Sequence, residues 1–156
     1  MLAVAQRVVK AAVTMKDTGD RRAIDGGLAI LLAVGHDDNQ ATASYMADKI
    51  VGLRIFDDDD GKMNKSLLDN PDNGVLVVSQ FTLLGDTRKG RRPSYIAAAA
   101  PSVAEPLYRY FVDLIKKTVR RVATGEFGAD MLVELHNDGP VTLIIESPPL
   151  QLGSNR

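Results

Sequence analysis

The sequence has no cysteine and no tryptophan, and only two of its 156 residues are histidine. The lack of cysteine excludes disulfide bonds, thiolate metal sites and a cysteine nucleophile, a composition that fits an intracellular protein. His36 and His136 are too few for a histidine metal cluster, and no group of His, Asp and Glu has the spacing of metal ligands. The sequence therefore predicts neither a metal ion nor another cofactor.

Long apolar runs and a large excess of one charge are also missing. No apolar run approaches the roughly 20 residues of a membrane span. Gln6 and Arg7 interrupt the apolar N-terminus, so we predict no signal peptide, no membrane partner and a cytoplasmic location. The formal net charge is -1. Any contact with nucleic acid must therefore be local.

The composition, with 45% hydrophobic and 25% charged residues, is typical of a globular protein. The length fits one domain with its own core, which we expect to cover residues 1–147. The remaining segment begins with prolines and is otherwise mostly polar. We therefore expect a flexible C-terminal tail over residues 148–156.

Apolar runs and turn signals predict several strands and two amphipathic helices. The first helix begins within residues 36–39 with an Asp or Asn cap and runs to about Leu53. The second begins at a capping box formed by Ser102 and Glu105. Its buried stripe consists of Leu107, Phe111, Leu114 and Ile115.

Outside the central stretch, the expected strands cover residues 1–15, 21–24, 28–34, 54–56, 62–68, 122–127, 131–136 and 141–146. The acidic run 57–60 and the segment 137–140 are expected to be turns between strands. The order of strands, helix, strands, helix and strands favours an α+β fold. We expect a mostly antiparallel, curved or barrel-like β-sheet with two main amphipathic helices packed on it.

The central stretch begins with the apolar run 75–78, which predicts a strand buried on both faces. Four candidate site residues follow it: Ser79, Gln80, Phe81 and Thr82. If the strand stays regular, Gln80 and Thr82 lie on one face and Ser79 and Phe81 on the other. Polar groups at the end of a buried strand need partners. Either a polar ligand or the neighbouring backbone could be the partner of these groups.

A basic loop follows this strand. Arg88, Lys89, Arg91 and Arg92 place four cations within five residues around Gly90. Such a loop can bind phosphates, because Arg and Lys supply both charge and hydrogen-bond donors. A solvated surface turn is the alternative. The loop indicates a nucleic-acid site more strongly here because the polar strand end directly precedes it.

These motifs resemble a known family. Residues 79–83 followed by 86–94 resemble one signature of the D-aminoacyl-tRNA deacylases, and residues 137–142 resemble the other. Residues 54–56 and 127–131 also fit, so the resemblance runs from the N-terminus to about Ser147. It implies the same kind of fold and an enzyme that hydrolyses the ester of D-aminoacyl-tRNA, releasing free D-amino acid and tRNA. L-aminoacyl-tRNA is rejected in this family.

The resemblance also implies roles for particular residues. Ser79, Gln80, Phe81 and Thr82 form the catalytic pocket.

The remaining implied roles belong to the second signature and to residues 127–131. Gly139 and Pro140, joined by a cis peptide, reach from one subunit of a homodimer into the active site of the other and exclude L-amino acids. Phe127 and Met131 help to hold the terminal adenosine. From their charge, we assign contact with tRNA to the four cations of the basic loop.

The residues alone leave several alternatives open. Thr82 is a nucleophile only with an activating base that the sequence does not place beside it, so we prefer an orienting role. Without the resemblance, Gly139 and Pro140 are most simply a turn. A non-catalytic dimer that binds an RNA 3′ end, or a purely structural protein, would carry the same motifs without chemistry. Release of amino acid from charged tRNA distinguishes the enzyme from both.

Overall fold

The computed structural model describes residues 1–148, so residues 149–156 of the predicted tail lie outside the described part of the chain. Within it the elements are, in order, β1 (Leu2–Met15), β2 (Arg21–Ile24), β3 (Gly27–Ala33), α1 (Gln40–Val51), β4 (Phe56–Asp57), β5 (Met63–Lys65), the 3-10 turn η1 (Leu67–Asp69), β6 (Gly74–Ser79), the 3-10 turn η2 (Phe81–Leu84), α2 (Pro101–Thr118), β7 (Arg121–Thr124) and β8 (Met131–Glu146).

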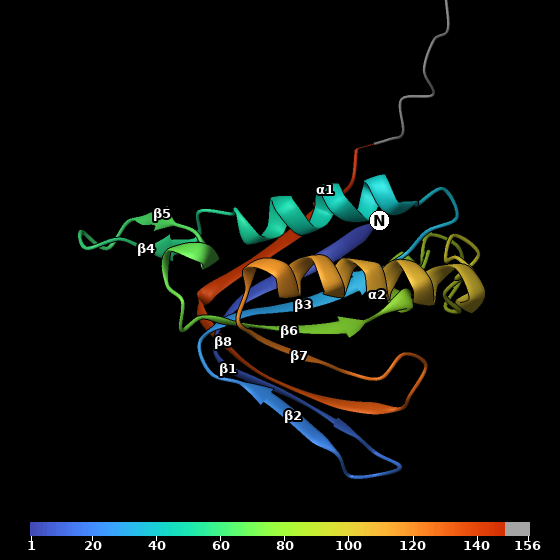
Figure 1. Cartoon of the computed structure of the whole chain (residues 1–156). Coiled ribbons are helices and arrows are strands. Elements are labelled where there is room, and N and C mark those ends of the chain that lie inside the picture. The colour runs from blue at the N-terminus through green and yellow to red at the C-terminus, as the bar shows by residue number, and fades with distance from the viewer. Residues whose placement is uncertain (149–156) are drawn as a thin grey trace, which may run out of the picture.

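The main sheet has the strand order β2-β1-β3-β6-β7, with β8 paired to β1. β1 pairs antiparallel with β2, β3 and β8, whereas β6 pairs parallel with β3 and β7. Both ends of the sheet approach each other, since Arg22 of β2 donates a hydrogen bond to the carbonyl oxygen of Thr124 in β7, 3.0 Å away. The expected curved, barrel-like sheet is confirmed (Figure 1), but its parallel centre was not predicted.

The parallel pairs explain where the helices lie. α1 connects β3 to β6 and α2 connects β6 to β7, so each helix is the crossover of a parallel pair. Such crossovers are right-handed, and the order β3-β6-β7 advances in one direction, so both helices cover the same face. Figure 1 shows α1 and α2 side by side across the sheet, and Ser44 Oγ of α1 lies 3.3 Å from the Tyr110 hydroxyl of α2.

The core lies on both faces of the sheet. One cluster joins the helices to the sheet and includes Met46, Ile50, Phe111 and Ile115. The other lies within the curve of the sheet and includes Val13 and Met15. Within β6, Val75 and Val77 belong to the first cluster and Leu76 and Val78 to the second, all at most 2% exposed. This strand is therefore buried on both faces, as predicted.

The two helix starts differ in how well the sequence predicted them. Asn39 caps α1, its side chain accepting from Thr42 N at 3.1 Å, which confirms the expected cap. The capping box expected at Ser102 and Glu105 is wrong, because α2 begins at Pro101 and has no side-chain cap. Proline fits the first helical position, where its fixed φ is helical and its missing N–H would have no partner.

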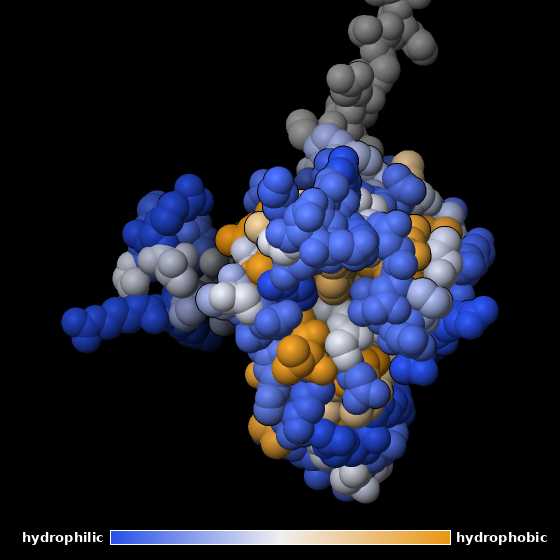
Figure 2. Space-filling view, turned by 90° about the vertical axis from the view of Figure 1, so that its left-hand side faces the viewer, coloured by the Kyte–Doolittle hydropathy of each residue, from blue (hydrophilic) through white to orange (hydrophobic). Residues whose placement is uncertain are grey.

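The surface carries one small separate sheet. β4 and β5 form a two-stranded hairpin, and residues 58–60 of the acidic run belong to its turn, whereas Asp57 is the last residue of β4. Figure 2 shows that hydrophilic residues cover most of this side of the molecule, with several separate hydrophobic patches. No helix in residues 1–148 is long and apolar enough to cross a membrane.

Candidate active site

The candidate site lies where the three parallel strands end. β3, β6 and β7 run in the same direction and end at Ala33, Ser79 and Thr124. Ligand sites in such sheets form beyond the carboxyl ends of the strands, because the connecting segments diverge there. A cavity of about 650 Å³ occupies this position, between the strand ends and the N-terminus of α2.

Five of the predicted site residues line this cavity together: Ser79, Gln80, Phe81, Phe127 and Met131. They are far apart in the sequence, and the end of β6 and the segment between β7 and β8 bring them to the same place. The cavity wall is otherwise mostly apolar. It is large enough for a small ligand and has polar groups at the end of β6.

β6 does not continue regularly through the site. Gln80 N donates to Leu32 O at 2.8 Å, after which the chain enters η2 instead of extending the ladder. The alternation of residues 79–82 between two faces, expected only for a regular strand, therefore does not apply. The physical reason is that β3 ends at Ala33 and β7 pairs with β6 only as far as Val77, so no ladder partner remains.

Thr82 contacts Gln80, which lines the cavity. The Gln80 side-chain amide donates a hydrogen bond to the Thr82 hydroxyl, while Thr82 itself is exposed and does not line the cavity. Phe81 is 55% exposed and packs edge-on against Tyr95, with ring centroids 5.2 Å apart. Thr82 is thus placed to orient an amide at the cavity wall.

No histidine stands beside Thr82. His36 Nε2 is 2.6 Å from Ile96 O, and His136 lies on β8 opposite Lys10. Neither residue lines the cavity. Within residues 1–148 there is also no group of three or more His, Asp or Glu side chains arranged to hold a metal ion.

The basic loop forms a turn beside this cavity. Asp86 and Ser94 close it with two backbone hydrogen bonds of 2.8 and 2.9 Å. Arg88 forms a bidentate ion pair with Asp86, at 2.9 and 2.7 Å, which lowers the pKa of Asp86 and raises that of Arg88. The described structure gives no ion pair to Lys89, Arg91 or Arg92, whose side chains are exposed. These three cations remain available for an anionic ligand.

Gly139 and Pro140 form a bulge within one continuous strand. Thr142 lies opposite Gln6 and Asn137 opposite Val8, so residues 138–141 face only Arg7 in β1. The expectation of a turn between two separate strands is wrong, because β1 pairs with both halves of β8. The Gly139–Pro140 peptide bond is cis, as the resemblance implies.

The side chains of Asn137 and Arg7 hold the bulge in place. Asn137 Nδ2 donates to Arg7 O at 3.1 Å and to Val141 O at 3.0 Å, which closes the base of the bulge. The Arg7 guanidinium is buried, donates to Ile55 O at 2.9 Å and lies 3.3 Å from the Asp138 carboxylate. Its Nε makes no hydrogen bond, so the contact with Asp138 is an ion pair only.

The bulge lies at the opposite end of the sheet from the cavity of the same chain. Val8 pairs with Gly27, which pairs with Gly74 at the start of β6, whereas the cavity lies beyond Ser79. Five strand residues separate these positions by about 16 Å. Gly139 and Pro140 are exposed, and neither lines the cavity.

Sequence reasoning missed part of the site. The cavity wall also includes Tyr95, Asp130 and the small residues 98–100 before α2. The alanine run 97–100 was the available signal, since small side chains leave room beside a helix start. Sequence reasoning also did not identify Arg7 as a residue that holds the bulge in place. A sequence pattern could have indicated it: Arg7 follows Ala3 and Ala5 at a spacing of two, which places its cationic side chain on the buried face of β1.

Comparison with known proteins identifies the family of this chain. Residues 4–146 match the model of a family described as D-Tyr-tRNA(Tyr) deacylase. The D-aminoacyl-tRNA deacylase of Thermosipho africanus is 55% identical over 148 residues, covering 94% of this chain and 97% of its own. That of Fervidobacterium nodosum is 53% identical over 149 residues, with the same coverage of both chains.

Solved structures show the same fold. The structure of a c-Myc DNA unwinding element binding protein is 40% identical, with a TM-score of 0.87, and the match covers 96% of this chain and 100% of that one. A probable eukaryotic D-amino acid tRNA deacylase is 17% identical, with a TM-score of 0.80 over 92% of this chain and 97% of that one, a likeness of fold alone. By its family match and its relatives, the chain belongs to the D-Tyr-tRNA(Tyr) deacylase family.

Proposed function

We propose that this protein hydrolyses the ester between a D-amino acid and the 3′-terminal adenosine of tRNA. The observation that carries the proposal is the convergence of Ser79, Gln80, Phe81, Phe127 and Met131 on one cavity at the strand ends. The relatives that are more than half identical over nearly the whole chain are named D-aminoacyl-tRNA deacylases. Both points favour hydrolysis over a non-catalytic dimer that binds an RNA 3′ end.

The chemistry in this proposal is positioning and charge stabilisation. The first hydrogen bond within η2 runs from Leu83 N to Gln80 O, so the N–H groups of Phe81 and Thr82 precede it and are not used inside the turn. These two N–H groups can donate to the oxyanion that forms when water attacks the ester carbonyl. Ser79 and Gln80 supply further polar groups at the cavity wall.

An aminoacyl ester is already activated, so no protein nucleophile is required. The ribose 2′-hydroxyl next to the ester can assist the attack of water. Phe127 and Met131, which also line the cavity, hold the adenosine by apolar contact and stacking. Lys89, Arg91 and Arg92 contact the RNA phosphates beyond it.

Selection of the D-enantiomer uses the bulge of a second copy in a homodimer. Three features support this part of the proposal: Gly139 and Pro140 are exposed, they lie far from the cavity of their own chain, and Arg7 and Asn137 hold them in place. A glycine wall brings backbone close to the substrate and leaves no room for an L side chain.

The surface around the bulge offers an area for this second copy. β8 pairs only with β1, and three large apolar side chains on these two strands are exposed: Val9 at 58%, Leu132 at 56% and Ile144 at 74%. Burial of such side chains stabilises a dimer. Because the substrate is used in translation, the expected location remains the cytoplasm.

The direct test is deacylation of matched substrates. The protein is incubated with D-tyrosyl-tRNA and L-tyrosyl-tRNA at equal concentration, and the released tyrosine is measured. We expect rapid release from the D-ester and release from the L-ester at the rate of a control without protein. Binding of both substrates without release would instead support the non-catalytic RNA-binding dimer.

A further inference from the structure

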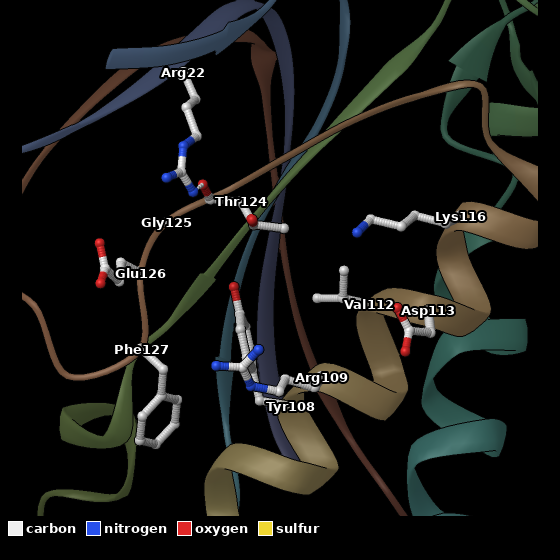
Figure 3. Close-up of a pocket in the computed structure, with 10 residues that line it drawn as sticks. All are labelled: Arg22, Tyr108, Arg109, Val112, Asp113, Lys116, Thr124, Gly125, Glu126 and Phe127. Atoms are coloured by element: carbon white, nitrogen blue, oxygen red, sulfur yellow. Dashed lines mark hydrogen bonds between the residues drawn. The ribbon is translucent and has the colours of Figure 1, made fainter. Parts of the chain in front are cut away.

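A second cavity lies on the far side of Phe127 from the active-site cavity. Its volume is about 290 Å³, and it lies between the exposed face of α2 and the end of β7 (Figure 3). We call it the α2–β7 groove. Phe127 lines both cavities, and its ring packs against Tyr108 with centroids 5.9 Å apart. A ligand that leaves the active site past Phe127 therefore enters this groove.

Three cations line the groove. Arg109 and Lys116 are seven residues apart on α2, which places them on one face of the helix, and Arg22 approaches from β2. Figure 3 shows the Arg22 guanidinium and the Lys116 amine around the space above the Tyr108 hydroxyl, and the Arg109 guanidinium beside the Tyr108 ring. The groove thus presents positive charge from two separate elements to one volume.

Two lining residues of the groove, Asp113 and Glu126, are acidic, but the ion pairs of its cations are made with carboxylates outside the lining. Arg109 forms a 2.6 Å ion pair with Glu105 and Arg22 a 2.8 Å ion pair with Asp20, whereas no ion pair of Lys116 is found within residues 1–148. Exposed pairs of this kind contribute roughly 0–1 kcal/mol and can be exchanged for a stronger anion. The lining carboxylates lie at the two sides of the groove in Figure 3.

The chemistry of the proposed substrate identifies the anion. The carboxyl group of the amino acid is esterified and its amino group is cationic, so the phosphates of the RNA are the anionic groups of the substrate. Phe127 is proposed to hold the terminal adenosine, whose 5′ oxygen is linked to the next phosphate. The next phosphate of the RNA therefore lies close to the adenosine at this ring.

We propose that the α2–β7 groove binds the RNA backbone directly 5′ to the terminal adenosine, with Arg22, Arg109 and Lys116 contacting its phosphodiester. This inference rests on the proposed function and adds a binding site to it. The affinity for charged tRNA then has two separate contributions. The active-site cavity binds the aminoacyl adenosine, and the groove binds only a substrate that carries a phosphate at the 5′ position.

Two substrates distinguish these contributions. D-tyrosyl-tRNA carries the phosphodiester, whereas 3′-O-D-tyrosyl-adenosine contains the same ester and no phosphate. We expect Lys116→Gln to raise KM for the tRNA substrate about fivefold, the effect of one exposed charge-assisted contact. The same variant should leave KM and kcat for the nucleoside ester unchanged. Arg109→Gln should behave in the same way.

Lys117→Gln is the matched control, because Lys117 is a neighbouring exposed lysine of α2 that does not line the groove. An equal effect of Lys117→Gln, or unchanged KM for tRNA in the groove variants, overturns the proposal. A loss with both substrates also overturns it, since that result indicates a general change in structure.

Failure of the proposed function gives a different result. If the wild-type protein cleaves neither ester, hydrolysis is refuted, and the groove is tested by binding of uncharged tRNA across a salt series. Lys116→Gln should then still weaken binding and lower the salt slope, whereas Lys117→Gln should not. Equal binding by both variants overturns the groove in this setting as well.

Discussion

Gly139→Ala adds a methyl group to the proposed selection wall. The structure shows the backbone strain and the close contacts that this group would cause. Gly139 has φ +117, outside the region that L side chains readily adopt. An added Cβ would lie 2.8 Å from Val141 Cγ2 and 3.1 Å from Arg7 Nη2, where carbon contacts normally need about 3.5–4.0 Å. Backbone strain of this kind costs about 1–3 kcal/mol, so the bulge must shift to accept the methyl group.

The matched control is Gly61→Ala. Gly61, in the β4–β5 turn, also has a positive φ of +74, but an added Cβ there meets no atom within 4 Å. We expect this variant to lose only about 1–2 kcal/mol from its backbone conformation. Urea unfolding at one protein concentration should show a larger midpoint shift for Gly139→Ala, by about 1 M or less at typical slopes.

Activity separates the two variants more sharply. A total stability of about 5–15 kcal/mol leaves both folded. Deacylation of D-tyrosyl-tRNA should fall at least about tenfold in Gly139→Ala, because each 1.4 kcal/mol lost in the transition state costs a factor of ten. Gly61→Ala should keep wild-type kcat/KM. Wild-type activity of Gly139→Ala, or stability equal to that of Gly61→Ala, would refute the assignment of this glycine to a crowded wall.

Three further predictions concern other parts of the molecule. Thr82→Ala should retain measurable deacylation with no trappable acyl-enzyme, because its hydroxyl bonds to Gln80; a covalent ester on Thr82, seen by mass spectrometry, contradicts this. Changing Lys89 and Arg91 to Ala should weaken tRNA binding and lower the slope of log affinity against log salt by about 1–2, and an unchanged slope places the RNA elsewhere. Burial raises the pKa of Tyr108 to about 12, so the folded state holds its proton more tightly than the unfolded chain, whose pKa is about 10. The stabilisation is complete below pH 10 and is lost towards pH 12, by about 3 kcal/mol; urea unfolding should show this loss in the wild type and not in Tyr108→Phe.

Local sequence patterns were sufficient for much of the fold. The cap at Asn39, the long first strand and the two-sided burial of residues 75–78 all follow from nearest-neighbour chemistry and periodicity. The family signatures identified the residues of the cavity, including Phe127 and Met131, which no local pattern would have joined to β6.

The misplaced features depend on strand pairing, which a single sequence does not reveal. η2 replaces the end of β6 because both neighbouring strands stop near Ser79. The bulge at Gly139 exists because β1 is long enough to pair with both halves of β8, whereas Asn, Asp, Gly and Pro in sequence normally indicate a turn. α2 begins at Pro101 because proline needs no cap there, although Ser102 and Glu105 match a capping box.

The central claim is that each active site combines the cavity of one chain with the bulge of another. It is tested most directly by mixing two variants that we expect to lose most of their activity, Gln80→Ala and Gly139→Ala, with different tags and exchanging their subunits. In a mixed dimer, one site receives both intact parts, so about a quarter of the wild-type sites should be active after random exchange. D-tyrosyl-tRNA deacylation should recover to that level, with L-tyrosyl-tRNA still untouched. Activity no greater than the mean of the two variants, in proven mixed dimers, would contradict the account.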